Sequence, residues 1–155
     1  MILESASAAE TSSFGEKLGK LLKAGDLVAL DGELGAGKTT LVKGIARGLG
    51  IKPETVLSPT FVLINEYEGR EKVFHLDWYR LDRVEGADAR LASECFDAQA
   101  VSLVEWASRG AEWLPAERIN VAIRHKGADR RSISVSARGA RPSVIVGSLK
   151  KKNLK

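Results

Sequence analysis

The chain has 155 residues, 44% of them hydrophobic and 28% charged, which is typical of a single globular domain and excludes a disordered or fibrous chain. No apolar run reaches the roughly 18 residues of a membrane helix, and the first residues carry an acid where a signal peptide needs a positive charge. We therefore expect a cytoplasmic protein without a membrane segment. A single cysteine excludes an intrachain disulfide and a cysteine-rich zinc site.

The net charge of +4 is equal to the contribution of four lysines near the C-terminus. These are Lys150, Lys151, Lys152 and Lys155. Because the rest of the chain is electrically balanced, a folded surface that binds nucleic acid directly is disfavoured. We expect one domain over residues 1–149, followed by a solvated basic tail over residues 150–155.

Hydrophobic periodicity predicts alternating helices and strands. A capping box at residues 7–10 and apolar residues at helical spacing predict a first helix over about residues 8–23. The apolar run 27–30 predicts a buried strand, which leads into a glycine-rich turn and a helix that ends at Gly50. The later predicted elements are strands at 61–64 and 72–76 with a turn at 68–71, a helix within 84–98, a strand at 101–104, a short helix at 108–114, an antiparallel strand pair at 119–123 and 133–137, and a turn at 138–142 toward residues 144–146.

Residues 32–39 match the phosphate-loop pattern G-x-x-x-x-G-K-[ST] in full, between a predicted strand and a predicted helix. Its glycines allow positive φ angles, so that successive backbone N–H groups can point at phosphate oxygens, and the helix N-terminus adds about half a positive charge. Lys38 is expected to reach the β- and γ-phosphates, and the Thr39 hydroxyl is expected to hold Mg²⁺. This loop is the strongest signal in the sequence, and it predicts binding of a nucleoside triphosphate.

Two acids end predicted strands, where a phosphate loop needs carboxylates for Mg²⁺ and for the attacking water. Asp77 shares one strand face with His75, and Glu105 ends the apolar run 101–104. Either acid could instead cap the next helix or pair with Arg80 or Arg109. We favour the functional role for both because the phosphate loop is present.

Several other side chains have competing interpretations. His75 is expected to be a packed, hydrogen-bonded histidine, and Trp106 and Trp113 are expected to be core or rim aromatics. Pro59 stiffens its loop and presents the Thr60 hydroxyl in a defined direction. That hydroxyl is a candidate sensor of the γ-phosphate or its Mg²⁺, and a rigid approach to the next strand explains the motif equally well.

Four motifs occur together in this short chain: DGELGAGKTT at 31–40, SPTF at 58–61, HLDWYRL at 75–81 and LVEW at 103–106. In this order they resemble the TsaE family (formerly YjeE), small bacterial P-loop ATPases required for threonylcarbamoyladenosine formation in tRNA. The resemblance covers most of the chain. It implies an α/β fold of the P-loop NTPase type, with a mostly parallel sheet flanked by helices and with antiparallel additions.

The resemblance also implies cofactors, partners and site roles. A TsaE-like protein uses ATP and Mg²⁺, acts with the TsaD and TsaB proteins, and resets that complex by ATP hydrolysis, so that it meets tRNA only through the complex. By position, Lys38 contacts phosphates, Thr39 and Glu105 are the Mg²⁺ ligands, and Asp77 orients the water or supports the metal. The nucleotide-binding residues that we expect are Thr11, Gly35, Ala36, Gly37, Lys38, Thr39, Thr40, Thr60 and Arg131.

Two other functions stay open. A small P-loop metabolite kinase needs an arginine-bearing lid, for which Arg80, Arg83 and Arg90 are candidates, although the predicted hairpin and C-terminal strands use the length that a lid requires. A nucleotide-dependent scaffold or RNA-binding module is disfavoured by the balanced charge. No arginine is obviously placed against the γ-phosphate, so we expect slow hydrolysis by the isolated chain and completion of the site by a partner.

Overall fold

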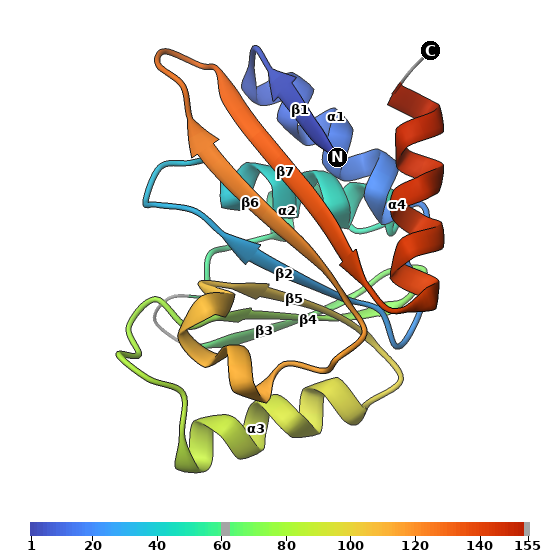
Figure 1. Cartoon of the computed structure of the whole chain (residues 1–155). Coiled ribbons are helices and arrows are strands. Elements are labelled where there is room, and N and C mark those ends of the chain that lie inside the picture. Colours follow the sequence, from blue (N-terminus) through green and yellow to red (C-terminus); the bar gives the residue numbers. More distant parts are fainter. Residues whose placement is uncertain (60–62, 154–155) are drawn as a thin grey trace.

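The structure is a computed structural model that describes residues 1–59 and 63–153. Its described residues form one seven-stranded sheet with helices on both faces (Figure 1). The strands are β1 (Ile2–Ser5), β2 (Leu27–Asp31), β3 (Ile64–Glu68), β4 (Lys72–Asp77), β5 (Val101–Glu105), β6 (Arg118–His125) and β7 (Arg131–Arg138). The helices are α1 (Ala8–Gly19), α2 (Lys38–Gly48), α3 (Gly86–Asp97) and α4 (Ala140–Asn153), with 3₁₀ turns η1 (Pro53–Thr55) and η2 (Ala107–Trp113).

The sheet has the strand order β1-β7-β6-β2-β5-β4-β3. The four central strands β6, β2, β5 and β4 are mutually parallel, whereas β7, β1 and β3 are added antiparallel. This arrangement confirms the expected α/β fold with a mostly parallel sheet. Because parallel strands end at the same edge, the loop after β2 and the ends of β4 and β5 lie together.

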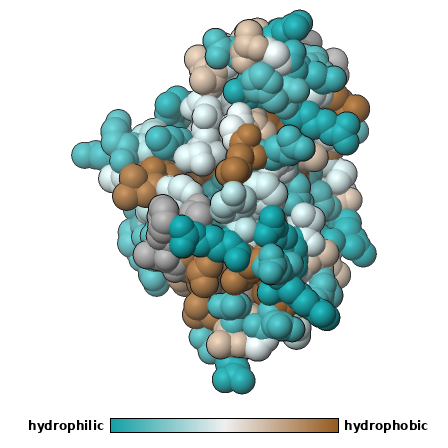
Figure 2. All heavy atoms as spheres, turned by 90° about the vertical axis from the view of Figure 1, so that its left-hand side faces the viewer, coloured by the Kyte–Doolittle hydropathy of each residue, from teal (hydrophilic) through white to brown (hydrophobic). Residues whose placement is uncertain are grey.

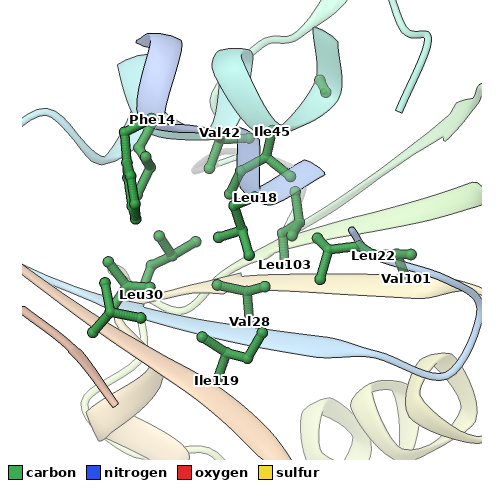
Figure 3. Packing of buried hydrophobic residues seen from close by; sticks show 14 of the residues in the cluster. Phe14, Leu18, Leu22, Val28, Leu30, Val42, Ile45, Val101, Leu103 and Ile119 are labelled. Atoms are coloured by element: carbon green, nitrogen blue, oxygen red, sulfur yellow. The ribbon is translucent and has the colours of Figure 1, made fainter. Parts of the chain in front are cut away.

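Each face of the sheet has its own hydrophobic core, as the alternation along β2 requires. Val28 and Leu30 face α1 and α2, and Figure 3 shows them packed beneath Phe14, Leu18, Val42 and Ile45. Leu27 and Ala29 face the opposite layer, which contains α3 and η2. The buried sheet therefore holds the N-terminus of α2, where the phosphate loop ends, in a fixed position.

Helices α1 and α2 pack closely because glycines line their contact. A Cβ atom on Gly44 would lie closer than 3.0 Å to the Ser12 carbonyl, and one on Gly15 would meet the backbone of Leu41 and Ile45 in the same way. Only glycine permits this approach, which fixes α2 against α1.

Some element boundaries differ from the sequence-based predictions. The first helix ends at Gly19, four residues early, because the chain turns at residues 20–21 to reach β2. The first hairpin strand begins at Ile64 and runs through Glu68, so the turn is shorter than predicted. Residues 61 and 62 of the predicted strand lie outside the described residues. The short helix predicted at 108–114 is the 3₁₀ turn η2.

Residues 150–152 of the predicted basic tail are exposed and helical. Lys150, Lys151 and Lys152 continue α4, and Asn153 at its end accepts a hydrogen bond from Lys17 Nζ of α1 at 3.1 Å. The sequence reading did not predict α4 or the short strand β1. Within the described part of the chain, no helix is both long and apolar enough to cross a membrane.

Candidate functional site

The phosphate loop joins β2 to α2 and has the backbone that its sequence predicts. Gly35 and Gly37 have φ angles of 77° and 108°, a region that favours glycine, and Gly37 caps α2. Ala36 N–H donates to the Glu33 carbonyl at 3.0 Å, which closes the loop tightly. The N–H groups in the first turn of α2 lack partners within the helix, as in any helix, and are therefore available to an anion.

Lys38 occupies the interior of this loop. Its ammonium group donates to the Gly32 carbonyl and to the Glu33 carbonyl at 2.8 Å, and it lies 4.6 Å from the ring centroid of Trp106. The side chain is almost fully buried. Burial lowers the pKa of Lys38, and nearby carboxylates, Glu105 first among them, oppose that shift. The loop thus holds a buried cation where phosphate oxygens are expected.

The expected metal and water residues converge on one pocket of about 260 Å³ beside Lys38. Its lining is Leu34, Gly35, Gly37, Lys38, Thr39, Thr40, Ser58, Asp77, Glu105 and Arg131. Ala36, although part of the loop, is buried and lines a neighbouring cavity instead of this pocket. Figure 2 views the molecule from the side on which the loop lies, where hydrophobic patches interrupt a mostly hydrophilic surface.

Asp77 and Glu105 form the acidic side of the pocket. The Asp77 carboxylate accepts hydrogen bonds from the backbone N–H of Tyr79 at 2.8 Å and from the Ser58 hydroxyl at 3.5 Å. Glu105 Oε2 lies 2.6 Å from His75 Nε2, which confirms the expected packed and hydrogen-bonded histidine. Both acids are buried at strand ends, where the sequence places them.

Arg109 is one of the two arginines considered as alternative partners of these acids, and its hydrogen bonds go elsewhere. The Arg109 guanidinium donates instead to the carbonyls of Tyr79 and Leu81, at 2.7 and 2.8 Å. Its guanidinium carbon also lies 5.0 Å from the ring centroid of Trp106, so that this indole is near both Arg109 and Lys38. The sequence predicted a core or rim position for Trp106 and did not predict its contact with the loop lysine.

Thr11 and Arg131 also border the loop. With Ala8, Gly37, Thr40 and Asp129 they line a space of about 30 Å³, close to the volume of one water molecule. The Thr11 hydroxyl is buried and lies 2.8 Å from the Ser5 hydroxyl, whereas Arg131 donates to the Gly35 carbonyl at 3.5 Å. Both residues therefore border the loop; Arg131 also lines the pocket that holds the two acids, whereas, of these two spaces, Thr11 lines only the smaller.

A larger cavity of about 600 Å³ lies between the loop and the end of β6. It is lined by residues 31–36 and 122–125. Sequence reasoning missed it, because only the parallel pairing of β2 with β6 brings these segments together. Thr60 lies outside the described residues, although Ser58 of the same motif lines the smaller pocket.

The oxygen atoms of this pocket suit a hard cation that is held partly by protein side chains and partly by the phosphates of a bound nucleotide. Among the described residues, no group of three or more His, Cys, Asp and Glu side chains is arranged to hold a metal alone. Mg²⁺ commonly binds through one or two carboxylates, substrate phosphates and water. The Thr39 hydroxyl and the Glu105 carboxylate border one pocket with the loop and match that pattern.

Comparisons with known proteins agree with this geometry. A family model described as "Threonylcarbamoyl adenosine biosynthesis protein TsaE" matches residues 5–133. The chain is 43% identical to the tRNA threonylcarbamoyladenosine biosynthesis protein TsaE of Bacillus subtilis, over 90% of this chain and 87% of the relative, and 41% identical to the TsaE protein of Treponema pallidum, over 85% and 97%. The crystal structure of Bacillus subtilis YdiB superposes with a TM-score of 0.82 at 36% identity and covers 99% of this chain and 95% of that chain.

Proposed function

The chain belongs to the TsaE family, and on that basis we propose that it is a Mg²⁺-dependent ATPase that serves the formation of threonylcarbamoyladenosine in tRNA. Its relatives carry the name of that biosynthesis, and its fold is that of a P-loop protein. The observation that carries the proposal is the convergence of Lys38, Thr39, Asp77 and Glu105 on one pocket at the carboxyl edge of the sheet.

In this proposal each residue has a distinct task. The backbone of residues 35–40 and the Lys38 ammonium bind the phosphates, for which Lys38 exchanges its carbonyl acceptors for phosphate oxygens. Thr39 and Glu105 hold Mg²⁺, and the metal, when bound, neutralises charge on the β- and γ-phosphates. Asp77 accepts hydrogen bonds beside them and orients the attacking water.

Thr11 and Arg131 are proposed to contact the remainder of the nucleotide, because both line a space with Gly37 and Thr40 of the loop and of the first turn of α2. Ala36 contributes backbone only, since its side chain is buried. The γ-phosphate contact proposed for Thr60 follows from its motif alone.

We propose that turnover depends on protein partners. Of the described arginines, only Arg131 lines the pocket, and its guanidinium donates to the Gly35 carbonyl and to the carbonyls of Ala128 and Arg130 in the β6–β7 turn. Leu34 at the pocket rim is 66% exposed, which suits a protein contact. TsaD and TsaB are the proposed partners, in the cytoplasm, with tRNA reached through them and with ATP hydrolysis resetting the complex.

The test is a phosphate-release assay with the isolated protein and with the purified TsaD and TsaB proteins. The proposal predicts slow release by the isolated protein and at least about a tenfold increase with both partners, since completed sites of this kind gain 10³- to 10⁵-fold from a supplied arginine. Fast hydrolysis that is indifferent to the partners would contradict partner dependence. Transfer of labelled γ-phosphate to a metabolite would identify a kinase instead.

A further inference from the structure

A buried histidine holds the Glu105 carboxylate from inside the sheet. In the β4–β5 ladder His75 is paired with Leu103, and Glu105 follows two residues later on the same face. The two side chains are therefore diagonal neighbours, which a long side chain can bridge. His75 is 0% exposed and Glu105 is 2% exposed, and His75 Nε2 lies 2.6 Å from Glu105 Oε2.

The second ring nitrogen shows which atom carries the proton. Within the described residues, His75 Nδ1 is buried and has no hydrogen-bond partner. A proton on Nδ1 would leave a buried N–H group unsatisfied, which is more costly than a bare lone pair. The hydrogen-bond network therefore assigns the proton to Nε2, so that His75 donates to Glu105.

This donor acts on Glu105, which ends the central strand β5 and borders Lys38 and Thr39 in the pocket. A carboxylate with a single fixed donor on one oxygen loses its freedom to rotate, and its remaining lone pairs are presented in a defined direction. Groups that orient metal ligands in this way commonly change metal affinity 10- to 100-fold when they are removed.

We propose that His75 is a positioning residue, which orients the Glu105 carboxylate toward the Mg²⁺ of a bound Mg²⁺–nucleotide by donating a hydrogen bond from Nε2 to Oε2. The inference rests on the proposed function, because it assumes that Glu105 holds the metal. A purely structural histidine would stabilise the sheet and leave metal affinity unchanged in a folded variant.

The test compares His75→Gln with His75→Asn. The glutamine amide reaches about as far as Nε2 and keeps a donor for Glu105, whereas the asparagine amide is one carbon shorter and does not reach it. The probe is Mn²⁺ in the presence of ADP, with Mn²⁺ binding followed by electron paramagnetic resonance. ADP binding in EDTA and thermal melting are measured alongside.

We expect His75→Asn to weaken Mn²⁺ binding about 10- to 100-fold, His75→Gln to recover most of that loss, and ADP binding in EDTA to stay within about twofold of the parent. Equal Mn²⁺ affinity of parent and His75→Asn would overturn the inference. Equal loss in both variants, or a parallel loss of ADP binding in EDTA, would also overturn it, because a collapsed pocket and not an oriented ligand would then explain the defect.

A double-mutant cycle with Glu105→Gln shows whether His75 acts through Glu105. If it does, His75→Asn has no further effect on Mn²⁺ affinity in the Glu105→Gln background. An undiminished effect in that background would contradict the inference. Failure of the parent to bind ADP in any condition would instead refute the proposed function, so the two failures are distinguishable.

Discussion

Asp77 and Glu105 are paired residues of the β4–β5 ladder and lie side by side at the carboxyl ends of these parallel strands. Both are buried, and the charges of both stabilise the ammonium form of Lys38. With both carboxylates ionised, their two negative charges are matched in the pocket lining by Lys38 and Arg131. Two adjacent carboxylates offer the hard oxygen ligands that a divalent cation requires, which is consistent with the metal–nucleotide complex proposed as the ligand.

Lys38→Ala tests the phosphate contact. Hydrogen bonds to charged groups contribute about 1.5–3 kcal/mol, so we expect nucleotide affinity to fall about 10- to 100-fold. Isothermal titration calorimetry measures the change. Lys43→Ala is the matched control, because Lys43 is exposed on the same helix α2. Parent-like affinity in Lys38→Ala would show that the loop lysine does not bind phosphate.

Asp77→Asn separates binding from turnover. Asparagine keeps an oxygen that accepts from the Tyr79 N–H but removes the carboxylate charge. We expect the partner-stimulated kcat to fall about 100-fold, which is the lower range for loss of a general base, while ATP affinity changes less than about threefold. If kcat of the variant matched the parent, the assignment of the water to Asp77 would be wrong.

The alkaline pH dependence of nucleotide binding follows from the lowered pKa of Lys38. Since only the ammonium form attracts phosphate, nucleotide affinity should decrease as the pH is raised, and the decrease should begin before pH 10.5, the usual lysine pKa, is reached. This decrease should be absent in Lys38→Ala.

The free energy of unfolding should change with pH in the opposite direction. Between the lowered pKa and 10.5 the unfolded chain binds more protons, so the Lys38 contribution to the free energy of unfolding increases with pH. Titrations of parent and variant side by side measure both trends.

Gly44→Ala tests the close contact of α1 with α2. The new Cβ would collide with the Ser12 carbonyl, and overpacking of this kind costs about 1–3 kcal/mol. We expect the melting temperature to fall by roughly 2–4 °C for each kcal/mol. Gly147→Ala in α4 is the control: nothing lies within 4 Å of its Cβ position, and alanine there should be neutral or stabilising. Equal melting of both variants would contradict this packing.

Local patterns were sufficient for the parts of the site that a short segment encodes. The phosphate loop needs glycines and a lysine at fixed spacing, and the two acids mark the ends of apolar strands, so the sequence predicted Lys38, Asp77 and Glu105 at one sheet edge. The hydrogen bond from His75 to Glu105 depends on the β4–β5 register, which no segment specifies alone. The contact of Trp106 with Lys38 has the same origin, because it joins two strand ends.

Long-range pairing also explains the elements that were missed. Strand β1 has four residues, too few for a clear pattern, and it forms on the edge of β7, where Met1 and Val135 exchange backbone hydrogen bonds at 2.6 and 2.8 Å. In α4 a signal was present: Pro142, Ile145, Val146 and Leu149 are buried at helical spacing. The lysines that follow them favoured the interpretation as a solvated tail.

The most direct test of the central claim is calorimetric titration of the folded protein with Mg²⁺–ATP, alone and in the presence of the TsaD and TsaB proteins. The account predicts saturable binding at one site per chain that Lys38→Ala weakens. No detectable uptake of Mg²⁺–ATP, either alone or with both partners, would contradict it.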